Sequence, residues 1–362
     1  MGGLQILLRF FWMIFVNILI TGAAGFIGSS FACQWAQENP NHHVVVLDAL
    51  TYAGRRSNLE ALEQHPGFHF VEGNIRDTAL VSQLLREHRI DCIVNFAAES
   101  HVDRSIADPM VFHHTNTEGT LSLLMAVRDV WKTSTNGKRF IQVSTDEVYG
   151  SFSGQGMPFT ENSPCRPGNP YSASKAAADA MVLAFHNTYG LDVVITRSSN
   201  NYGPNQYPEK LIPKTIKRIL QNEPIPLYGD GLHQRDWIHV LDNARGIALA
   251  IQKGKPGAIY NLGAGEEVTN RYLVQQLCRC MNRLFSIDRN LTQRFPMATA
   301  AQRGQAETLI HYVADRPGHD LAYTMDTTLS QQVLGFQPQL ALEAGLEQTV
   351  RAVLQPAARH PA

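Results

Sequence analysis

A hydroxyl and two carboxylates stand side by side in residues 144–150, which read Ser-Thr-Asp-Glu-Val-Tyr-Gly. They follow the apolar run 140–143, which is typical of a buried parallel strand. In open α/β sheets, reacting and binding groups lie just beyond the carboxyl ends of the strands. At such a place Thr145, Asp146 and Glu147 can supply a hydrogen bond to a developing oxyanion, an acid and a base. A polar strand end that begins a turn has the same composition, so this stretch alone leaves both interpretations open.

A tyrosine and a lysine one helical turn apart form the second candidate group. Tyr171 and Lys175 lie in an alanine-rich stretch after Pro170, and proline suits the first turn of a helix. Because positions i and i+4 share a helix face, the ammonium can favour the phenolate of a group whose pKa is ordinarily about 10. The phenol of Tyr171 could then act as a base near neutral pH. An amphipathic surface helix can carry the same two residues without a catalytic role.

A glycine-rich turn, Gly-Ala-Ala-Gly-Phe-Ile-Gly at 22–28, lies between an apolar run and an apparent helix at 29–38. Glycines here allow a tight turn and close approach of the backbone to a pyrophosphate, which then faces the helix N-terminus. The apolar run 44–47 ends at Asp48, where a carboxylate can hold the adenine-ribose hydroxyls and favours NAD over NADP. Arg55 and Arg56 nearby are interpreted as solvated loop charges and not as a 2′-phosphate site. The turn residues expected to contact NAD are Gly22, Gly25, Phe26, Ile27 and Gly28.

Apolar runs alternate with helical segments along the first half of the chain. We expect strands at 14–20, 44–47, 68–71, 92–96, 140–143 and 193–195, with helices at 29–38, 79–88 and 118–130. This alternation predicts an α/β fold, a Rossmann-type doubly wound parallel sheet with a smaller C-terminal α/β substrate domain. The expected boundaries are 1–12 for an extension without a role in the fold, 13–200 for the NAD-binding domain with the catalytic residues, 201–354 for a mainly substrate-binding domain interleaved with the first, and 355–362 for a disordered tail. Residues 286–306 look like a polar loop.

Composition limits the classes of partner. The 362 residues carry a formal net charge of -1, so no electrostatic argument favours nucleic acid or an anionic membrane. The apolar stretch 4–20 is short for a membrane span, is interrupted by Gln5, Arg9 and Asn17, and has no small-residue cleavage site after it. Five scattered cysteines without metal-ligand spacing predict a reduced, cytoplasmic protein with no metal site.

Taken together, these residues resemble the extended short-chain dehydrogenase/reductase superfamily and, within it, the nucleoside-diphosphoglucose 4,6-dehydratases, above all those acting on dTDP-glucose. The resemblance runs from about residue 15 to about residue 354. Its motifs stand in order at 97–105, 144–150, 171–175, 199–204, 208–213, 235–237 and 314–320.

The resemblance implies a redox-neutral elimination that converts dTDP-glucose to dTDP-4-keto-6-deoxyglucose. Tyr171 takes the proton of the 4-hydroxyl, Thr145 bonds the developing oxygen and Lys175 sustains the phenolate. Glu147 removes the proton on carbon 5, and Asp146 protonates the departing 6-hydroxyl. NAD takes the hydride from carbon 4 and returns it to carbon 6. Sugar-nucleotide epimerases and glucuronate decarboxylases lack the aspartate, so Asp146 favours dehydration. A UDP-glucose 4,6-dehydratase, an epimerase or decarboxylase, and a non-catalytic NAD-binding regulator are the alternatives.

The resemblance also implies further contacts and a homodimer paired through helices that include the one carrying Tyr171. Where the family usually has an aspartate near the adenine, this chain has Asn74. The further cofactor contacts are Thr51, Asn74, Ile75, Ala97, Ala98, Ser100, Thr115 and Asn201. The substrate contacts are Ser100, Thr145, Asn200, Lys210, Leu211, Pro226, Tyr228, Arg235, Asn270, Arg316 and His319.

Overall fold

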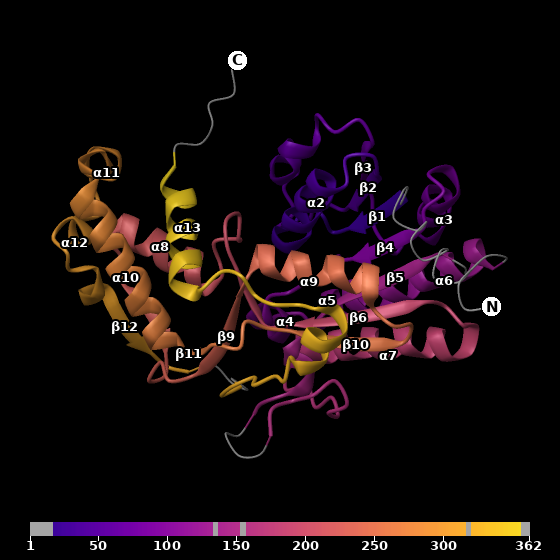
Figure 1. The fold of residues 1–362 in the computed structure, drawn as a ribbon. Helices are drawn as coiled ribbons and strands as arrows, with labels where there is room; N and C mark the ends of the chain where they lie inside the picture. Colours follow the sequence, from indigo (N-terminus) through magenta and orange to yellow (C-terminus); the bar gives the residue numbers. More distant parts are fainter. Residues whose placement is uncertain (1–16, 133–136, 153–156, 316–319, 356–362) are drawn as a thin grey trace.

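A seven-stranded parallel sheet is the framework of the larger half of the molecule (Figure 1). The computed structural model describes residues 17–132, 137–152, 157–315 and 320–355. The strands lie in the order β10 (Ala258–Leu262), β6 (Val193–Ser198), β5 (Arg139–Thr145), β4 (Cys92–Asn95), β1 (Asn17–Thr21), β2 (His43–Asp48) and β3 (Phe68–Glu72). The chain runs outward in opposite directions from β1 and β4, so their carboxyl ends form the topological switch point at which α/β sheets bind ligands. The predicted doubly wound parallel sheet is confirmed.

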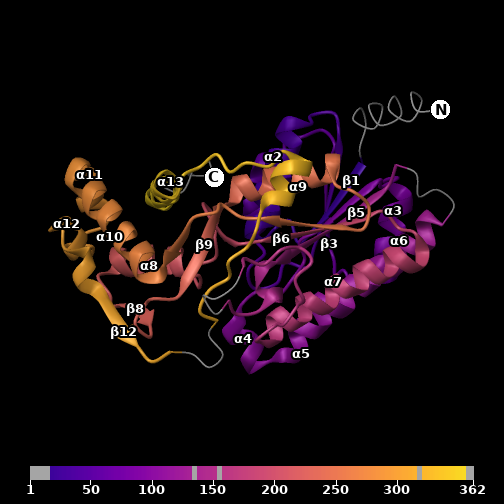
Figure 2. The ribbon, with the colours of Figure 1, turned by 60° about the horizontal axis from the view of Figure 1, so that its bottom comes forward.

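Helices cover both faces of this sheet (Figure 2). Because side chains alternate along a strand, Ile18 and Ile20 of β1 pack on one face and Leu19 packs on the other. The first face is covered by α2 (Phe26–Glu38) and α9 (Val240–Lys253), and the second by α3 (Thr78–Glu87), α6 (Gly119–Trp131) and α7 (Pro170–Tyr189). Burial on both sides explains why the strands read as continuous apolar runs in the sequence.

The smaller half has a hydrophobic core of its own, which includes Ile216, Leu277 and Leu346. Its three-stranded sheet contains β11 (Glu267–Thr269), β9 (Gln234–His239) and β7 (Asn200–Tyr202), and a two-stranded sheet pairs β12 (Ile310–Val313) with β8 (Ile225–Tyr228). The helices around them are α8 (Leu211–Gln221), α10 (Asn270–Ile287), α11 (Arg289–Arg294), α12 (Thr299–Gln302) and α13 (Leu342–Leu354). Since α9 and β10 return to the larger half after β9, the two halves interleave along the chain.

Some segments differ from their expected form. Residues 286–306 are not an unstructured polar loop: they contain α11 and α12, and Leu291, Ala298 and Ala301 pack into the smaller core. The helix expected at 118–130 begins at Gly119, after a π-helical turn, η2 (His113–Glu118). The expected extension at 1–12, the start of the first strand at 14–16 and the tail at 356–362 lie outside the described residues.

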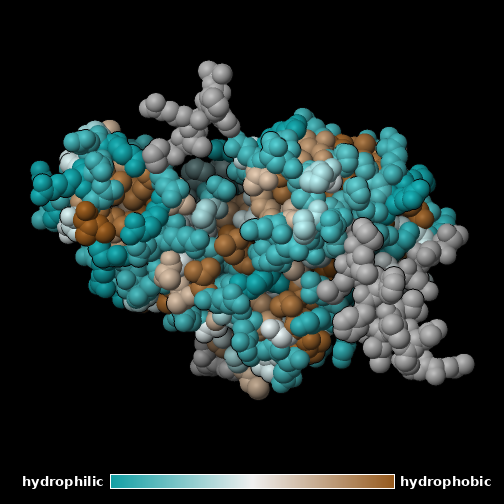
Figure 3. All heavy atoms as spheres, turned by 45° about the horizontal axis from the view of Figure 1, so that its top comes forward, coloured by the Kyte–Doolittle hydropathy of each residue, from teal (hydrophilic) through white to brown (hydrophobic). Residues whose placement is uncertain are grey.

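The described surface is predominantly polar. Figure 3 shows a largely hydrophilic face on which hydrophobic side chains form small, separate groups. No helix in the described ranges is both long enough and apolar enough to cross a membrane.

Candidate active site

A cavity of about 880 Å³ lies beyond the carboxyl ends of the large sheet and extends into the smaller half. Predicted residues from both halves converge on it. Those that line the cavity are Gly22, Gly25, Phe26, Ile27, Gly28, Asp48, Thr51, Asn74, Ile75, Ala97, Ala98, Ser100, Thr115, Thr145, Asp146, Glu147, Tyr171, Lys175, Asn200, Asn201, Lys210, Leu211, Pro226, Tyr228, Arg235 and Asn270. Arg316 and His319 lie outside the described residues.

The glycine turn forms a cradle between β1 and α2. Gly22 has φ 68°, and a Cβ there would come within 2.6 Å of the Cα of Ala97. A Cβ on Gly28 would lie 2.5 Å from the carbonyl oxygen of Gly22. Gly25 is the N-cap of α2 and offers no side chain to the first helical N–H groups. These N–H groups and the partial positive charge of the helix end suit a diphosphate.

Two side chains at the ends of neighbouring strands line the adenosine end of such a site. Asp48 accepts hydrogen bonds from the backbone N–H groups of Ala24 and Leu50, each 2.8 Å long. Burial raises the pKa of Asp48, and these two bonds oppose the rise. The Asn74 Oδ1 accepts from the N–H of Arg76 at 2.9 Å, so its amide NH₂ group is the end that can donate to a ligand.

The acid pair begins where β5 ends. Thr145 caps the turn η3 (Asp146–Tyr149): its hydroxyl accepts from the Glu147 N–H at 3.2 Å and donates to Asp146 Oδ1 at 3.2 Å. Asp146 is 2% exposed. Burial, followed by the charge of Glu147, raises the pKa of Asp146 well above its usual range, while the cation of Arg235 acts in the opposite direction. These effects together favour the protonated form of Asp146.

Helix α7 presents the tyrosine and the lysine to the same cavity. Asn169 caps the helix by accepting from the Ser172 N–H at 3.0 Å in a capping box, which fixes where the first turn begins. Lys175 Nζ donates to the carbonyl oxygen of Val143 on β5 at 2.6 Å. Burial lowers the pKa of Lys175 to about 8, and Asp179 opposes this shift.

The phenol of Tyr171 is not acidified by its protein surroundings. Burial and then the charge of Glu147 raise its pKa, although its hydrogen bond with Thr145 acts in the opposite direction. This rise is opposite to the lowering expected from Lys175, so a further positive charge beside the phenol is needed before it can act as a base near neutrality.

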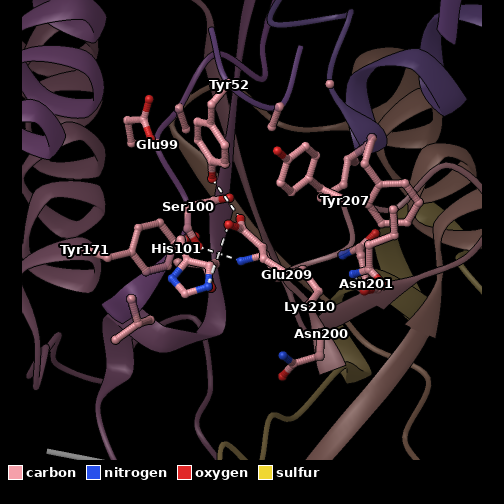
Figure 4. A pocket seen from close by; sticks show the side chains of 18 of the residues that line it. Tyr52, Glu99, Ser100, His101, Tyr171, Asn200, Asn201, Tyr207, Glu209 and Lys210 are labelled. Carbon is pink, nitrogen blue, oxygen red and sulfur yellow. Dashed lines mark hydrogen bonds and ion pairs between the residues drawn. The ribbon is translucent and has the colours of Figure 1, made fainter. Parts of the chain in front are cut away.

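A cluster of polar contacts bridges the two halves at this cavity (Figure 4). The hydroxyl of Tyr52 donates to Glu209 Oε1 at 2.9 Å, and the ring of His101 lies 3.8 Å from Glu209 Oε2. Lys210 Nζ donates to the carbonyl oxygen of Ser100 at 2.8 Å. We call Tyr52, Ser100, His101, Glu209 and Lys210 the bridge cluster. The sequence analysis gave no role to Tyr52, His101 or Glu209, although His101 and Glu209 lie within motifs that it singled out and Tyr52 adjoins Thr51.

Aromatic and cationic side chains support the bridge cluster from outside. The guanidinium of Arg104 lies 3.6 Å from the ring centroid of Tyr52, and Tyr207 meets the same ring edge-on at 5.3 Å. Arg55 lies over Tyr207 at 5.6 Å, while Arg56 lies over the ring of Phe70 at 4.7 Å. Both arginines are exposed, and each also lies over an aromatic ring.

The side-chain amides in the substrate half differ in whether their hydrogen-bonding atoms have partners within the protein. Asn200 Oδ1 and Asn270 Oδ1 are buried and have no hydrogen-bond partner in the part of the chain that the structure describes. By contrast, the side chain of Asn201 donates to the carbonyl oxygen of Ser199 at 3.0 Å and accepts from Asn243 at 2.9 Å. Unsatisfied buried amides are expected where a polar ligand completes the site.

Arg235 is anchored at the rear of the cavity. Its guanidinium donates to the carbonyl oxygens of Asp320 at 2.9 Å and Leu321 at 3.1 Å. It also lies 4.5 Å from the ring centroid of Tyr323. These contacts hold the guanidinium of Arg235 where its charge lowers the pKa of Asp146. The family resemblance implies a diphosphate contact alone for Arg235.

Within the described ranges, no group of three or more His, Cys, Asp or Glu side chains is placed to hold a metal ion.

Comparison with known proteins agrees with this geometry. Residues 19–349 match the family described as GDP-mannose 4,6 dehydratase. The chain is 47% identical to a dTDP-glucose 4,6-dehydratase of Xanthomonas campestris pv. campestris over 92% of this chain and 91% of the relative. It is 44% identical, with a TM-score of 0.81, to the structure of DesIV, the dTDP-glucose 4,6-dehydratase of Streptomyces venezuelae with NAD and TYD bound; 93% of this chain and 96% of that one are covered. A UDP-glucose 4-epimerase of Thermotoga maritima, bound to UDP-glucose, is 28% identical with a TM-score of 0.78 over 93% and 98% of the two chains. The chain therefore belongs to the nucleotide-sugar 4,6-dehydratase family of the extended short-chain dehydrogenases/reductases.

Proposed function

We propose that the protein removes water from dTDP-glucose, with NAD as cofactor, and releases dTDP-4-keto-6-deoxyglucose. One observation carries this proposal: Asp146 and Glu147, at the carboxyl end of β5, line the same cavity as Tyr171, Lys175 and the glycine cradle. The nucleotide is taken from the dTDP-glucose 4,6-dehydratases that this chain resembles at 44% and 47% identity.

The residues that line the cavity suit a dinucleotide. The cradle of Gly22 and Gly28 leaves room for backbone approach to a pyrophosphate, Asp48 suits the adenine-ribose hydroxyls, and Asn74 suits the edge of the adenine. When bound, NAD supplies the acceptor for the hydride of carbon 4 and its donor to carbon 6. Its positive ring also supplies the charge that the phenol of Tyr171 lacks in its protein surroundings.

Oxidation of carbon 4 depends on a proton acceptor at its hydroxyl. Tyr171 takes that proton, and the hydroxyl of Thr145 donates a hydrogen bond to the oxygen as it becomes a carbonyl. Lys175, held by the carbonyl of Val143, keeps a cation close to the phenolate. The 4-ketone then acidifies the hydrogen on carbon 5.

Elimination uses the two neighbouring carboxyl groups in opposite protonation states. Glu147 removes the proton from carbon 5, and Asp146 gives its proton to the 6-hydroxyl, which leaves as water. Glu147 returns its proton to carbon 5 when the hydride reaches carbon 6, and the proton that Tyr171 took replaces the one that Asp146 gave up. The raised pKa of Asp146 supports this division, because like charges in one buried site keep the two groups in different protonation states.

The substrate contacts follow from the lining of the cavity. Asn200 and Asn270 have buried amide oxygens open to a ligand hydroxyl or N–H. Lys210 and Arg235 bring cations for the diphosphate, and Pro226 and Tyr228 of β8 line the region proposed for the base. The family motif assigns Arg316 and His319 to the nucleotide in the same proposal.

The test is to incubate the purified protein with dTDP-glucose, add alkali, and record the near-ultraviolet absorbance of a 4-keto-6-deoxy sugar nucleotide. An epimerase would give a galactose isomer without that absorbance, and a regulator that only binds NAD would leave the sugar unchanged. Competition between dTDP-glucose and UDP-glucose separates the two dehydratase alternatives. Equal turnover of both sugars, or faster turnover of UDP-glucose, would contradict the assigned nucleotide.

We further propose a homodimer in a cytoplasmic location. Met125 of α6 and Met181 of α7 are each 38% exposed, and Tyr189 at the end of α7 is 46% exposed, so this face offers apolar surface for a second copy. The five cysteines are all free thiols, as expected in a reducing compartment. Sedimentation of the protein and of a Met181→Glu variant tests the dimer: a monomeric parent, or a variant as dimeric as the parent, would contradict it.

A further inference from the structure

A third ionisable side chain continues the line of Tyr171 and Lys175 along α7. Asp179 lies one helical turn beyond Lys175, as Lys175 lies one turn beyond Tyr171. Residues at this spacing have Cβ atoms roughly 6 Å apart on one helix face. Lys175 is 4% exposed and Asp179 is 1% exposed, so water screens neither charge effectively.

Asp179 is held from the opposite side by an arginine of the sheet. Arg197 Nε on β6 donates to Asp179 Oδ2 at 3.0 Å, and the two side chains are 3% and 2% exposed. The guanidinium lies 4.7 Å from the ring centroid of Tyr149, whose hydroxyl donates to Asn261 at 2.7 Å. Burial raises the pKa of Asp179, and the charges of Arg197 and then Lys175 oppose that rise, so these contacts favour the carboxylate form.

The charges around Lys175 single out Asp179. Among the described residues, Asp179 is the carboxylate whose charge opposes the effect of burial on the ammonium. Glu147 and Asp146, on η3, raise the pKa of Tyr171, and Asp179 does so to a smaller extent. Arg139 on β5 is buried, but it pairs with Asp192 at the start of the strand. The remaining charged groups on elements that pack against α7 are at least partly exposed: Asp103 and Arg104 on α4 (Val102–Ala107), His113, His114 and Glu118 on η2, and Arg128 and Asp129 on α6.

We propose that Asp179 is a positioning residue, whose buried carboxylate, anchored by Arg197, keeps the ammonium of Lys175 charged and in place beside Tyr171. This role rests on the proposed dehydration, in which the cation sustains the phenolate. The carbonyl of Val143 fixes the lysine head but carries no net charge, so it cannot replace a carboxylate. An isolated ammonium at this depth would release its proton at a lower pH.

The decisive test follows the protonation of Lys175 without using turnover. The protein, with its cofactor bound, is labelled with ¹³Cε-lysine, and the Lys175 signal is identified as the one that Lys175→Met removes. The proposal predicts that Asp179→Asn lowers the titration midpoint of this signal by about one pH unit or more. Asp179→Glu, which keeps the charge, restores the midpoint most of the way. An unchanged midpoint in Asp179→Asn would overturn the proposal.

The activity arm measures kcat for dTDP-glucose against pH. In Asp179→Asn the alkaline limb moves to lower pH, and kcat near pH 8 falls about 10- to 100-fold. A loss of equal size at all pH values would indicate a structural role and overturn the proposal. If the parent protein does not dehydrate dTDP-glucose, the proposed function fails, while the lysine titration still decides the role of Asp179.

Asp192→Asn is the matched control. Asp192 pairs with Arg139 at 2.9 and 3.0 Å, at the opposite end of β5 and β6, far along the strands from Lys175. Breaking this pair costs stability, but it leaves the Lys175 midpoint unchanged. If Asp179→Asn does not fold because Arg197 is left unpaired, the double variant Asp179→Asn/Arg197→Gln removes both charges. We expect the Lys175 midpoint to fall in the double variant too, but by less than in Asp179→Asn. An unchanged Lys175 midpoint in the double variant would also overturn the proposal.

Discussion

The hydroxyl of Tyr52, in the loop after β2, donates a 2.9 Å hydrogen bond to Glu209, which lies 157 residues further along the chain in the substrate half. This bond joins the two walls of the cavity, so it should help to retain what lies between them. We expect Tyr52→Phe to raise the KM for dTDP-glucose and the rate of NAD loss about 5-fold each, with kcat within twofold of the parent. One hydrogen bond of about 1 kcal/mol accounts for that factor.

Steady-state kinetics and dialysis of the NAD-loaded protein measure these two effects. Tyr312→Phe is the control, because Tyr312 is 50% exposed on β12 and does not line the cavity. A Tyr52→Phe variant with parental KM and NAD retention would assign the bond to the fold alone.

Removal of either acid should stop elimination without emptying the cofactor site. We expect Asp146→Asn and Glu147→Gln each to lower kcat by 10²- to 10⁴-fold, the range typical of lost general acid or base catalysis, with NAD content unchanged. The alkaline absorbance assay measures kcat, and the absorbance of the nucleotide released on denaturation measures NAD. Near-parental turnover in both variants would refute the roles assigned to the two carboxyl groups.

The same aspartate should make the protein less stable as the pH rises. Its folded-state pKa is raised by burial, so the folded protein binds this proton more tightly than the unfolded chain does, and stability falls as the pH rises above about 4. Asp146→Asn removes this effect and should raise the Tm by a few degrees at pH 7 to 8. Near pH 4 the increase in Tm should vanish. Thermal scans of the parent and of Asp146→Asn at pH 4 and at pH 7 to 8 measure this difference. A variant with a lower Tm at pH 8 would contradict the assigned protonation state.

Two glycines of the cradle should fail in different ways. A Cβ on Gly25 would lie no closer than 3.2 Å to the protein, whereas one on Gly28 would lie 2.5 Å from a backbone oxygen. Gly25→Ala should therefore fold and lose NAD affinity 10-fold or more, because the methyl group occupies the space of the pyrophosphate. Gly28→Ala should lower the Tm as well. Thermal scans and NAD titrations separate the cases, and tight NAD binding by Gly25→Ala would argue against this cradle.

By the family resemblance, Asn74 stands where an aspartate near the adenine is usual. Its amide NH₂ can donate to the adenine, whereas Oδ1 already accepts from Arg76 and has only one lone pair left for the adenine amino group. We expect Asn74→Asp to bind NAD about 3- to 10-fold more tightly, since a carboxylate has acceptor capacity for both partners. Calorimetric titration of the cofactor-free protein measures the change, and weaker binding would show that Asn74 donates to the base.

The groups that sequence reasoning located are those whose signals are local. The glycine turn, Asp48 and the pair Tyr171 and Lys175 each lie within a few residues of a recognisable strand or helix end. The bond between Tyr52 and Glu209 and the pair of Asp179 with Arg197 depend on how distant segments meet, and no spacing within one element encodes them. Helices α11 and α12 were missed for a different reason, because 6 and 4 residues are too few for a helical period to be visible.

The charges that act on Asp146, the proposed catalytic acid, come from both sides of the division between the two sheets. Arg235 and Asp236 are neighbours on β9 in the three-stranded sheet, and they act in opposite directions on the proton affinity of Asp146 at the end of β5. A slight displacement of β9 relative to β5 would change the balance of these two charges at the acid. Substitutions that move the small sheet, and that touch neither sugar nor nucleotide, are thus a route by which related chains can retune the rate of water loss.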